Sequence, residues 1–280
     1  MNDPRGPIVG DLRLVTFLTD FGLRDPSAGV LSGVVLAMTP SARTLDLTHA
    51  IPPYDVEAGA EALVESLVHL PVGAHVAVVD PGVGTQRRPI AIRCVRGDVL
   101  IGPDNGLLLP AARALGGVAA VVVLDDERWW GPNRSHTFHG RDLFAPVAAH
   151  LAAGVPFGEL GSPLDASLLV PAAALPLEAR AGELHTVVRI VDGFGTLVLA
   201  GDRGDITGAL GALEPGQPLS ISIGANKIET VWANRFGDVP VQAPLCYIDS
   251  AGRLALAVNR GSAAERYGAT RRTPVVIRRT

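Results

Sequence analysis

Five polar residues stand where strands are expected to end or where glycine permits a turn: Asp20, Asp80, Arg87, His139 and Asp192. Side chains in such places can converge on one crevice, because ligands of open α/β sheets bind beyond the carboxyl ends of the strands. Each also has a simpler interpretation. An aspartate close to glycine is often a turn residue, the arginine could lie on a solvated hairpin edge, and the histidine could be structural. Residue types alone thus indicate a carboxylate-rich ligand crevice and leave its chemistry open.

Other common chemistries lack their motifs. His136 and His139 have H-x-x-H spacing, but no neighbouring Cys or Glu completes a zinc set, so we expect no metal. The sequence contains no G-x-S-x-G elbow, no Walker loop and no G-x-G-x-x-G fingerprint. Cys94 and Cys246 are far apart among apolar neighbours, which predicts two buried thiols in a reducing compartment.

Composition narrows the classes of partner. The 280 residues carry 24 basic and 28 acidic side chains, a net charge of −4, which offers no basic surface for nucleic acid. Apolar runs such as residues 118–124 are far shorter than the roughly 20 residues that span a bilayer. Residues 1–5 lack the apolar core of a signal peptide. We therefore expect a cytoplasmic protein that acts on a small molecule, without nucleic acid or membrane as a partner.

Up to about residue 165, strand and helix patterns alternate, which predicts an α/β layer with a mostly parallel sheet. Asp55 has the chemistry of an N-cap for a helix whose apolar residues recur at spacings of three and four. Asp20 and Asp80 each follow a buried strand, so they are expected at the same edge of the sheet. The expected strands are residues 13–19, 44–48, 75–79, 88–95, 98–102 and 118–124, and the other expected helices are residues 28–38, 107–115 and 142–153.

Beyond residue 176 the pattern changes to short strands with many turn residues and little helical periodicity. This is typical of a small antiparallel sandwich or barrel. We therefore predict two domains, an α/β amino-terminal domain over residues 1–172 and a smaller β-barrel-like carboxyl-terminal domain over residues 185–280. The expected strands of the latter are residues 185–191, 196–199, 218–223, 230–232, 245–249 and 254–258.

Six short motifs occur in order along the chain and carry a family resemblance. Together they resemble the S-adenosyl-L-methionine (SAM) hydrolases, also called SAM hydroxide adenosyltransferases, which are relatives of fluorinase and chlorinase. The resemblance covers about residues 13–270. The motifs are Thr-Asp-Phe-Gly at 19–22, Ile-Pro-Pro-Tyr-Asp at 51–55, Val-Asp-Pro-Gly-Val-Gly-Thr at 79–85, Gly-Pro-Asp-Asn-Gly-Leu at 102–107, Thr-Phe-His-Gly-Arg-Asp at 137–142 and Asn-Arg-Gly-Ser-Ala-Ala at 259–264.

The resemblance implies that water cleaves SAM at the ribose C5′ carbon and releases adenosine and L-methionine. It also implies that no metal or other cofactor takes part, with SAM being the substrate. The family fold pairs an α/β amino-terminal domain with a barrel-like carboxyl-terminal one, in agreement with the change of pattern along this chain. The resemblance further implies a homotrimer whose active sites lie between neighbouring subunits.

In the family, an Asp, Arg and His set holds the water, and these positions fall on Asp80, Arg87 and His139. Water has a pKa of about 15.7, so a hydroxide-like nucleophile needs a carboxylate or imidazole to take its proton, or a cation to stabilise the anion. Arginine cannot be the base, because its own pKa exceeds about 12. We expect Arg87 to orient and stabilise, and the other two to bind the water and relay its proton. Which of them finally holds the proton stays open.

The resemblance also implies a set of substrate contacts. Asp20 would bind the ribose hydroxyls, with Tyr54 beside the sugar or base, and Asp192 would meet the methionine ammonium group. Thr196 stands where relatives usually carry Asn, and Ala251 replaces an arginine of fluorinase. The remaining contacts would be three aromatic residues of the adenosyl pocket, Phe138, Phe194 and Phe236, and Ser250 near the methionine end.

Two alternatives to the hydrolase remain. A SAM-dependent halogenase, similar to chlorinase, would use a halide instead of water, but the Asp80, Arg87 and His139 set favours water. The chain also lacks the insertion that fluorinases carry near residues 95–98. A non-catalytic sensor of adenosine or SAM would use the same pocket without turnover.

Overall fold

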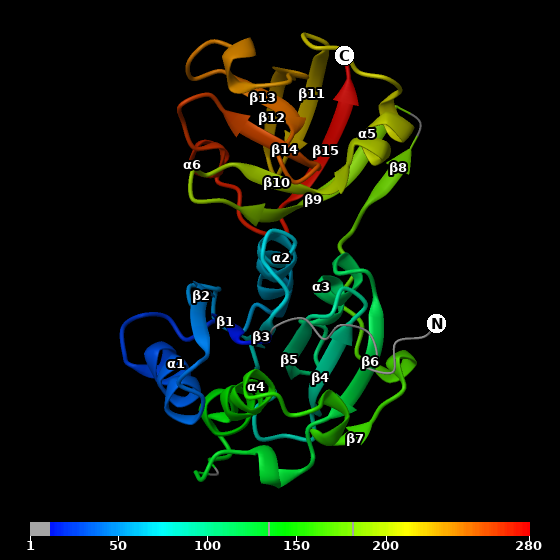
Figure 1. Cartoon of the computed structure of the whole chain (residues 1–280). Coiled ribbons are helices and arrows are strands. Elements are labelled where there is room, and N and C mark those ends of the chain that lie inside the picture. Colours follow the sequence, from blue (N-terminus) through cyan, green and yellow to red (C-terminus); the bar gives the residue numbers. More distant parts are fainter. Residues whose placement is uncertain (1–11, 134, 181) are drawn as a thin grey trace. The chain divides into compact units, whose positions relative to one another are not determined.

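The computed structural model describes residues 12–133, 135–180 and 182–280, and the chain divides into two compact units, Met1–Ala173 and Ala174–Thr280 (Figure 1). Residues 1–5, which carry the expectation about a signal peptide, lie outside the described residues. Within the described part, no helix combines the length and apolar character that crossing a bilayer requires.

The first unit is built on a seven-stranded sheet with the order β2-β1-β3-β5-β4-β6-β7. The first four strands of that order are parallel, β4 and β7 run against them, and β6 runs with them. The prediction of a mostly parallel sheet is therefore confirmed. The strands are β1 (Leu14–Thr19), β2 (Arg43–Thr48), β3 (Ala74–Val78), β4 (Pro89–Cys94), β5 (Val99–Pro103), β6 (Val118–Val123) and β7 (Ser162–Pro163).

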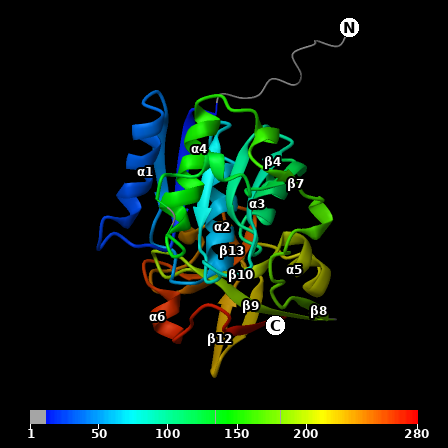
Figure 2. The ribbon, with the colours of Figure 1, turned by 90° about the horizontal axis from the view of Figure 1, so that it is seen from below.

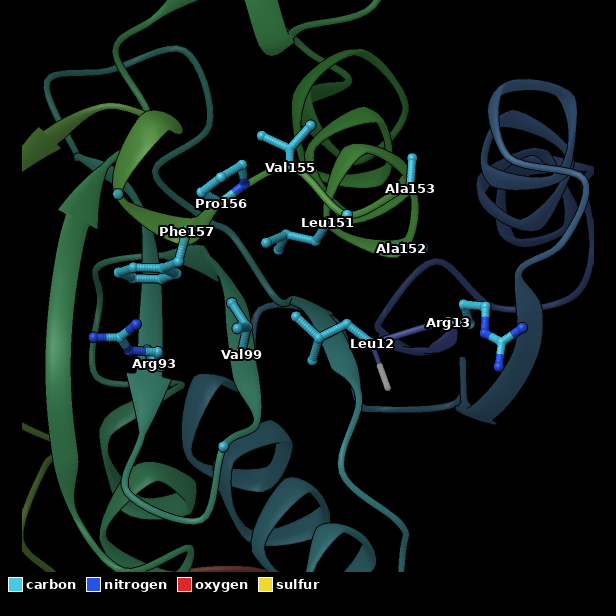
Figure 3. Close-up of a pocket in the computed structure, with 13 residues that line it drawn as sticks. Leu12, Arg13, Arg93, Val99, Leu151, Ala152, Ala153, Val155, Pro156 and Phe157 are labelled. Atoms are coloured by element: carbon cyan, nitrogen blue, oxygen red, sulfur yellow. The ribbon is translucent and has the colours of Figure 1, made fainter. Parts of the chain in front are cut away.

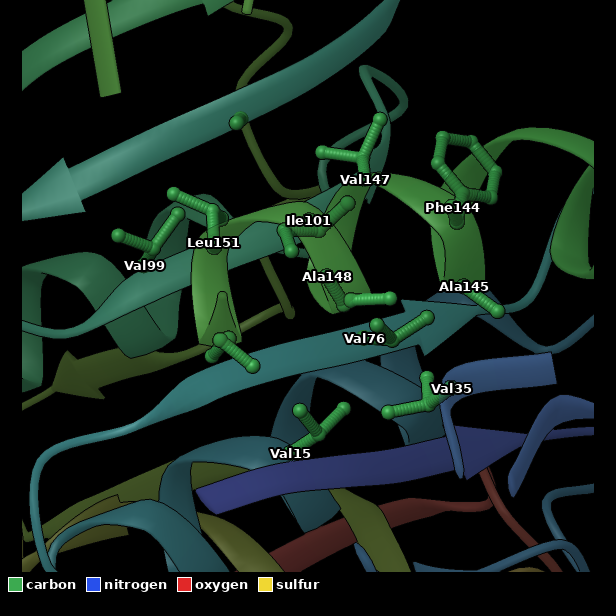
Figure 4. Packing of buried hydrophobic residues seen from close by; sticks show 14 of the residues in the cluster. Val15, Val35, Val76, Val99, Ile101, Phe144, Ala145, Val147, Ala148 and Leu151 are labelled. Atoms are coloured by element: carbon green, nitrogen blue, oxygen red, sulfur yellow. The ribbon is translucent and has the colours of Figure 1, made fainter. Parts of the chain in front are cut away.

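Helices cover both faces of this sheet, because alternate side chains of its strands are apolar on each side. On one face Val15 and Phe17 pack with α1 (Ser27–Met38) and α4 (Ala145–Ala152), two helices that lie side by side in Figure 2. Figure 4 shows side chains of this cluster, among them Val15 of β1, Val35 of α1 and Ala148 of α4. On the other face Leu18 packs with α2 (Val56–Leu67) and α3 (Leu109–Ala114). The short turns of this unit are η1 (Glu127–Trp129), η2 (Gly140–Phe144), η3 (Phe157–Glu159) and η4 (Ala166–Leu168).

The second unit holds an eight-stranded antiparallel sheet with the order β12-β11-β15-β9-β10-β14-β13, and β8 pairs with β9. Beyond the end of β12, Trp232 forms a bridge to Cys246 of β13, so the two ends of the sheet meet. This confirms the barrel-like description. The strands are β8 (Glu178–Arg180), β9 (Glu183–Val191), β10 (Leu197–Asp202), β11 (Pro218–Ile223), β12 (Asn226–Val231), β13 (Pro244–Ile248), β14 (Arg253–Val258) and β15 (Pro274–Arg279), joined by α5 (Arg203–Leu210), η5 (Phe236–Asp238) and α6 (Ala263–Tyr267).

The helix expected over residues 142–153 begins differently from the prediction. It starts earlier, as the π-helical turn η2, in which the Ala145 N–H bonds to the Gly140 carbonyl. The cause is Pro146, which has no N–H to donate to the carbonyl of Asp142 four residues earlier. That carbonyl accepts instead from the Gly131 N–H, at 2.8 Å. The turn places His139 at the start of the helix.

Candidate active site

Asp80 and Arg87 form a buried ion pair just beyond β3. Arg87 donates to Asp80 Oδ2 from Nε at 2.9 Å and from Nη2 at 2.6 Å. Their side chains are only 9% and 5% exposed for Arg87 and Asp80, respectively. The connecting loop reverses at Gly84, whose φ of +76° favours glycine, and a Cβ there would stand 2.8 Å from the His136 carbonyl oxygen. Glycine therefore lets this loop lie against the segment that carries His139.

The same guanidinium reaches His139. Arg87 Nη2 lies 2.7 Å from His139 Nδ1, and because a guanidinium only donates, Nδ1 must accept. The neutral imidazole then carries its proton on Nε2. The pKa of His139 is lowered from 6.5, first by burial and then by the positive charge of Arg87, with the charge of Asp80 acting in the opposite direction. The ring is therefore neutral at pH 7.

One carboxylate oxygen of Asp80 accepts no hydrogen bond from the described residues. Oδ2 accepts both bonds from Arg87, whereas Oδ1 is buried and has no hydrogen-bond donor among the described residues. A buried acceptor without a partner is costly unless a ligand or water completes it. The geometry thus leaves one strong acceptor free in a site whose cation is already placed.

These groups lie at a pocket of about 370 Å³. Asp80 and His139 line it, whereas Arg87 is not among its lining residues and acts from behind them. The walls are Asp20, Phe21, Pro53, Tyr54, Val78, Val83, Thr137, Phe138 and Gly140. The pocket therefore joins the carboxyl ends of β1 and β3 to the segment before η2.

Asp20 and Tyr54, which also line this pocket, are hydrogen-bonded to each other. Asp20 Oδ2 accepts a hydrogen bond from the Tyr54 main-chain N–H at 2.9 Å. Tyr54 has a φ of +66°, a left-handed conformation that is unusual for a bulky residue, and its side chain is largely exposed. Phe138 packs edge to face against Phe21, with their ring centroids 5.6 Å apart. The pocket thus presents a carboxylate beside aromatic surface.

The second unit has a pocket of its own, of about 540 Å³. Asp192 Oδ1 accepts from the main-chain N–H groups of Phe194 and Thr196, both at 2.8 Å, and so shapes the loop before β10. Phe236 packs edge to face against Tyr247 at 5.4 Å. The pocket is lined by Asp192, Phe194, Thr196, Phe236, Tyr247, Val258, Arg260 and Gly261.

Comparison with known proteins assigns the chain to a family. The model of the SAM hydroxide adenosyltransferase N-terminal domain matches residues 15–161, and that of the C-terminal domain matches residues 186–276. The chain belongs to the SAM hydroxide adenosyltransferase family. This confirms the resemblance carried by the six motifs.

Relatives of the chain are named as hydrolases or as fluorinases. The (R)-S-adenosyl-L-methionine hydrolase of Salinispora tropica is 44% identical over 91% of this chain and 94% of its own length. That of Thermus thermophilus is 39% identical over 94% and 99%. The fluorinase of an Actinoplanes strain is 29% identical over 91% and 93%. A crystal structure of an uncharacterized conserved protein from Thermotoga maritima, 31% identical, superposes with a TM-score of 0.87 over 95% of this chain and 100% of that one.

Not every predicted substrate contact lines a pocket. Ser250 lies in the exposed turn between β13 and β14, outside the pocket of the second unit, where Asp249 Oδ1 accepts from the Ala251 N–H at 2.9 Å. Conversely, Tyr247 and Arg260 line that pocket and were missed. Arg260 stands in the Asn-Arg-Gly motif at 259–261 and could have been found there. Tyr247, in the middle of a strand, gave no such signal.

A further cavity of the first unit lies apart from these residues. It has about 580 Å³ and lies where β1 and β5 begin, at the edge of the sheet opposite Asp20 and Asp80 (Figure 3). Its walls are largely apolar, and the Arg93 guanidinium stacks over the Phe157 ring at 5.3 Å. Among the described residues, no group of three or more His, Cys, Asp or Glu side chains is arranged to hold a metal ion.

Proposed function

We propose that the protein hydrolyses SAM to adenosine and L-methionine by attack of water on ribose C5′. The observation that carries the proposal is the open Oδ1 of Asp80 beside an Arg87–His139 pair that is already hydrogen-bonded. The family to which the chain belongs, and relatives named as SAM hydrolases, support the same reaction.

In this proposal, Asp80 Oδ1 accepts a hydrogen bond from the attacking water and then its proton. His139 cannot take that proton at Nδ1, because Arg87 Nη2 donates to this atom. Its Nε2–H is left to orient the water as a donor to oxygen. Arg87 keeps the carboxylate in place and offsets negative charge on the nucleophile. The residue types alone left open whether Asp80 or His139 accepts the proton. We therefore propose that the Asp80 carboxylate accepts it.

The bond changes balance without another reactant. The water oxygen forms a bond to C5′, the C5′–sulfur bond breaks, and its electron pair stays on sulfur as the neutral thioether of methionine. One proton passes through Asp80 to solvent. A neutral thioether leaves without help from an acid or a metal, so we propose that no cofactor takes part. Holding the water in line with the breaking bond contributes most of the rate enhancement.

The substrate contacts are proposed from the two pockets. Asp20 binds the ribose hydroxyls, with Tyr54 and Phe138 beside the sugar and base, and Asp192 Oδ2 meets the methionine ammonium group. Its Oδ1 already accepts two main-chain bonds. Phe194, Thr196 and Phe236 contact the adenosyl group, and Ser250, from the exposed turn outside the pocket of the second unit, is proposed to approach the methionine end.

We further propose a homotrimer, in which the pocket of the first unit of one subunit and the pocket of the second unit of a neighbour hold one substrate. Aromatic Phe194 is 85% exposed, as expected of a side chain that a ligand or a neighbour covers. Light scattering on purified protein tests the trimer, with three subunits expected and a monomer contradicting it.

The two domains are proposed to cover residues 1–172 and 185–280.

Product analysis tests the reaction. Purified protein is incubated with SAM in ¹⁸O-labelled water, with and without chloride, and products are separated by chromatography with mass detection. We expect methionine and adenosine that carries one ¹⁸O at its 5′ position. A 5′-chloroadenosine product would indicate the halogenase, and unchanged SAM that is nevertheless bound would indicate a sensor.

A further inference from the structure

Residues 102–107 contact both ends of the loop that joins Asp80 to Arg87, although no step of the proposed reaction uses them. Asn105 Nδ2 donates a hydrogen bond to the carbonyl of Val79 at 2.9 Å, and Val79 directly precedes Asp80. The next residue after Arg87 is held as well. The main-chain N–H of Asp104 donates to the carbonyl of Arg88 at 2.9 Å.

The Val79 carbonyl needs a partner from outside the sheet ladder. The pairing of β3 with β5 runs from Ala74–Val99 to Val76–Ile101, so Val79 lies beyond its last pair. Val79 is fully buried, and a buried carbonyl without a donor is costly. Asn105 supplies the donor, and its Oδ1 accepts from the Leu107 N–H at 3.2 Å, which fixes the orientation of the amide.

Gly102 makes this contact possible. A Cβ on Gly102 would stand 2.2 Å from the Ala77 carbonyl oxygen, closer than real atoms approach. Only glycine therefore lets the end of β5 pass the β3 backbone at this distance. The path of the chain then carries Asn105 to the carbonyl of Val79.

An ion pair strengthens the second contact, between Asp104 and Arg88. Arg88 Nε donates to Asp104 Oδ2 at 2.9 Å, and Asp104 Oδ1 accepts from the Val170 N–H at 2.9 Å. The Asp104 side chain is only 3% exposed. Both of its oxygens are thus engaged, and the chain at Arg88 is fixed by its main chain and by its side chain.

We propose that Asn105 and Asp104 are positioning residues for the hydrolytic site. They hold the chain at Val79 and Arg88, so that the intervening loop, which contains Gly82 and Gly84, presents Asp80 to the pocket and Arg87 to His139. The inference rests on the proposed function. Neither residue lines the pocket, so both act through the loop and not on substrate.

The test uses Asn105→Asp in the full-length protein. The substitution preserves shape and the acceptor for Leu107, but places an oxygen against the Val79 carbonyl in place of the donor. A misplacement of about 1 Å costs on the order of 100-fold in rate, so we expect kcat to fall about that much. The KM for SAM stays within about threefold, because the residues proposed to bind it are not displaced.

A matched control is Asn226→Asp. Asn226 Nδ2 also donates to a main-chain carbonyl, that of Tyr267 at 2.8 Å, but it lies on an exposed hairpin of the second unit. This variant should keep wild-type kcat. If it loses as much activity as Asn105→Asp, substitution of such an amide is damaging in general and the positioning role is overturned.

A double-mutant cycle separates positioning from general structure. In an Asp80→Asn background the loop no longer presents its carboxylate, so adding Asn105→Asp should reduce kcat no further. Additive losses would overturn the inference. A crystal structure of Asn105→Asp should show a longer separation between Arg87 Nη2 and His139 Nδ1, and an unchanged separation would also overturn it.

The experiments distinguish failure of the proposed function from failure of the positioning role. If the wild-type protein makes no adenosine, the proposed function fails, and the inference that rests on it fails with it. If wild type hydrolyses SAM but Asn105→Asp keeps its kcat, only the inference fails. Should Asn105→Asp not fold, Asn105→Ser replaces it, and if that variant also cannot fold, the segment serves folding and the positioning role is overturned.

Discussion

Arg87 donates from Nη2 to Nδ1 of His139 across 2.7 Å, which makes the imidazole an acceptor at that atom and a donor at Nε2. The same Nη2 lies 2.6 Å from Asp80 Oδ2. One cation therefore fixes the tautomer of the histidine and the orientation of the carboxylate together. In the proposed mechanism, the Asp80 carboxylate oxygen therefore accepts the proton and the His139 Nε2–H orients the water.

The pKa of His139 should depend on Arg87. Because the guanidinium charge lowers this pKa, Arg87→Gln should raise it toward the ordinary 6.5. The measurement is an NMR titration of the imidazole, compared with Arg128→Gln, which changes an exposed arginine that pairs with the half-buried Asp126. An unchanged or lower pKa in Arg87→Gln would contradict the contact.

Asp20→Asn should weaken substrate binding more than turnover. Asparagine keeps an acceptor for the Tyr54 N–H, but loses the charged oxygens that we propose for the ribose hydroxyls. The Kd for SAM, measured by calorimetry, should rise about tenfold, a loss of about 1.4 kcal/mol. A Kd equal to that of wild type would remove Asp20 from the ribose site.

The two cysteines should be inert in the native protein. Burial raises the pKa of Cys94 and of Cys246 to about 12, so almost no thiolate exists at pH 8. A chromogenic thiol reagent should therefore react with neither before unfolding and with both after it. Rapid reaction of the native protein would show that at least one thiol is accessible.

Stability should fall in mild acid. Burial lowers the pKa of His75, His139 and His150 below 6.5 in the folded chain. The unfolded chain then binds more protons as the pH falls below that value, so the free energy of unfolding should decrease from about pH 7 to about pH 5. Urea denaturation at the two pH values measures this, and a midpoint that rises in acid would show that the histidines are not held neutral.

Much of the architecture could be predicted because buried strands are short and apolar. The strand predicted around Phe17, residues 13–19, agrees with β1 to within a residue at each end. The rule that parallel strands end at one edge of a sheet correctly placed Asp20 and Asp80 at the same pocket. Asp55 caps α2 as its position indicated, accepting from Ala58 N at 2.9 Å. These features depend on neighbours in sequence or on one general rule of topology.

The features that could not be predicted depend mostly on contacts between residues that lie far apart in the sequence. Helix α5 escaped prediction because glycines interrupt its eight residues, while the reciprocal cap of Asp202 and Asp205 that begins it is a local signal that could have been found. The buried hydrogen bonds from Thr16 of β1 through His75 of β3 to Asp98, just before β5, form no sequence motif. The contact of Asn105 with Val79 likewise spans 26 positions. Only the folded chain brings such pairs together.

In the proposed reaction, Asp80 activates the water that attacks SAM. The kcat of Asp80→Asn tests this role, measured beside Asp126→Asn, which changes a half-buried aspartate that also pairs with an arginine. We predict that Asp80→Asn loses about 100-fold to 10,000-fold in kcat while the Kd for SAM stays close to wild type. A kcat within a few-fold of wild type would contradict this role of Asp80.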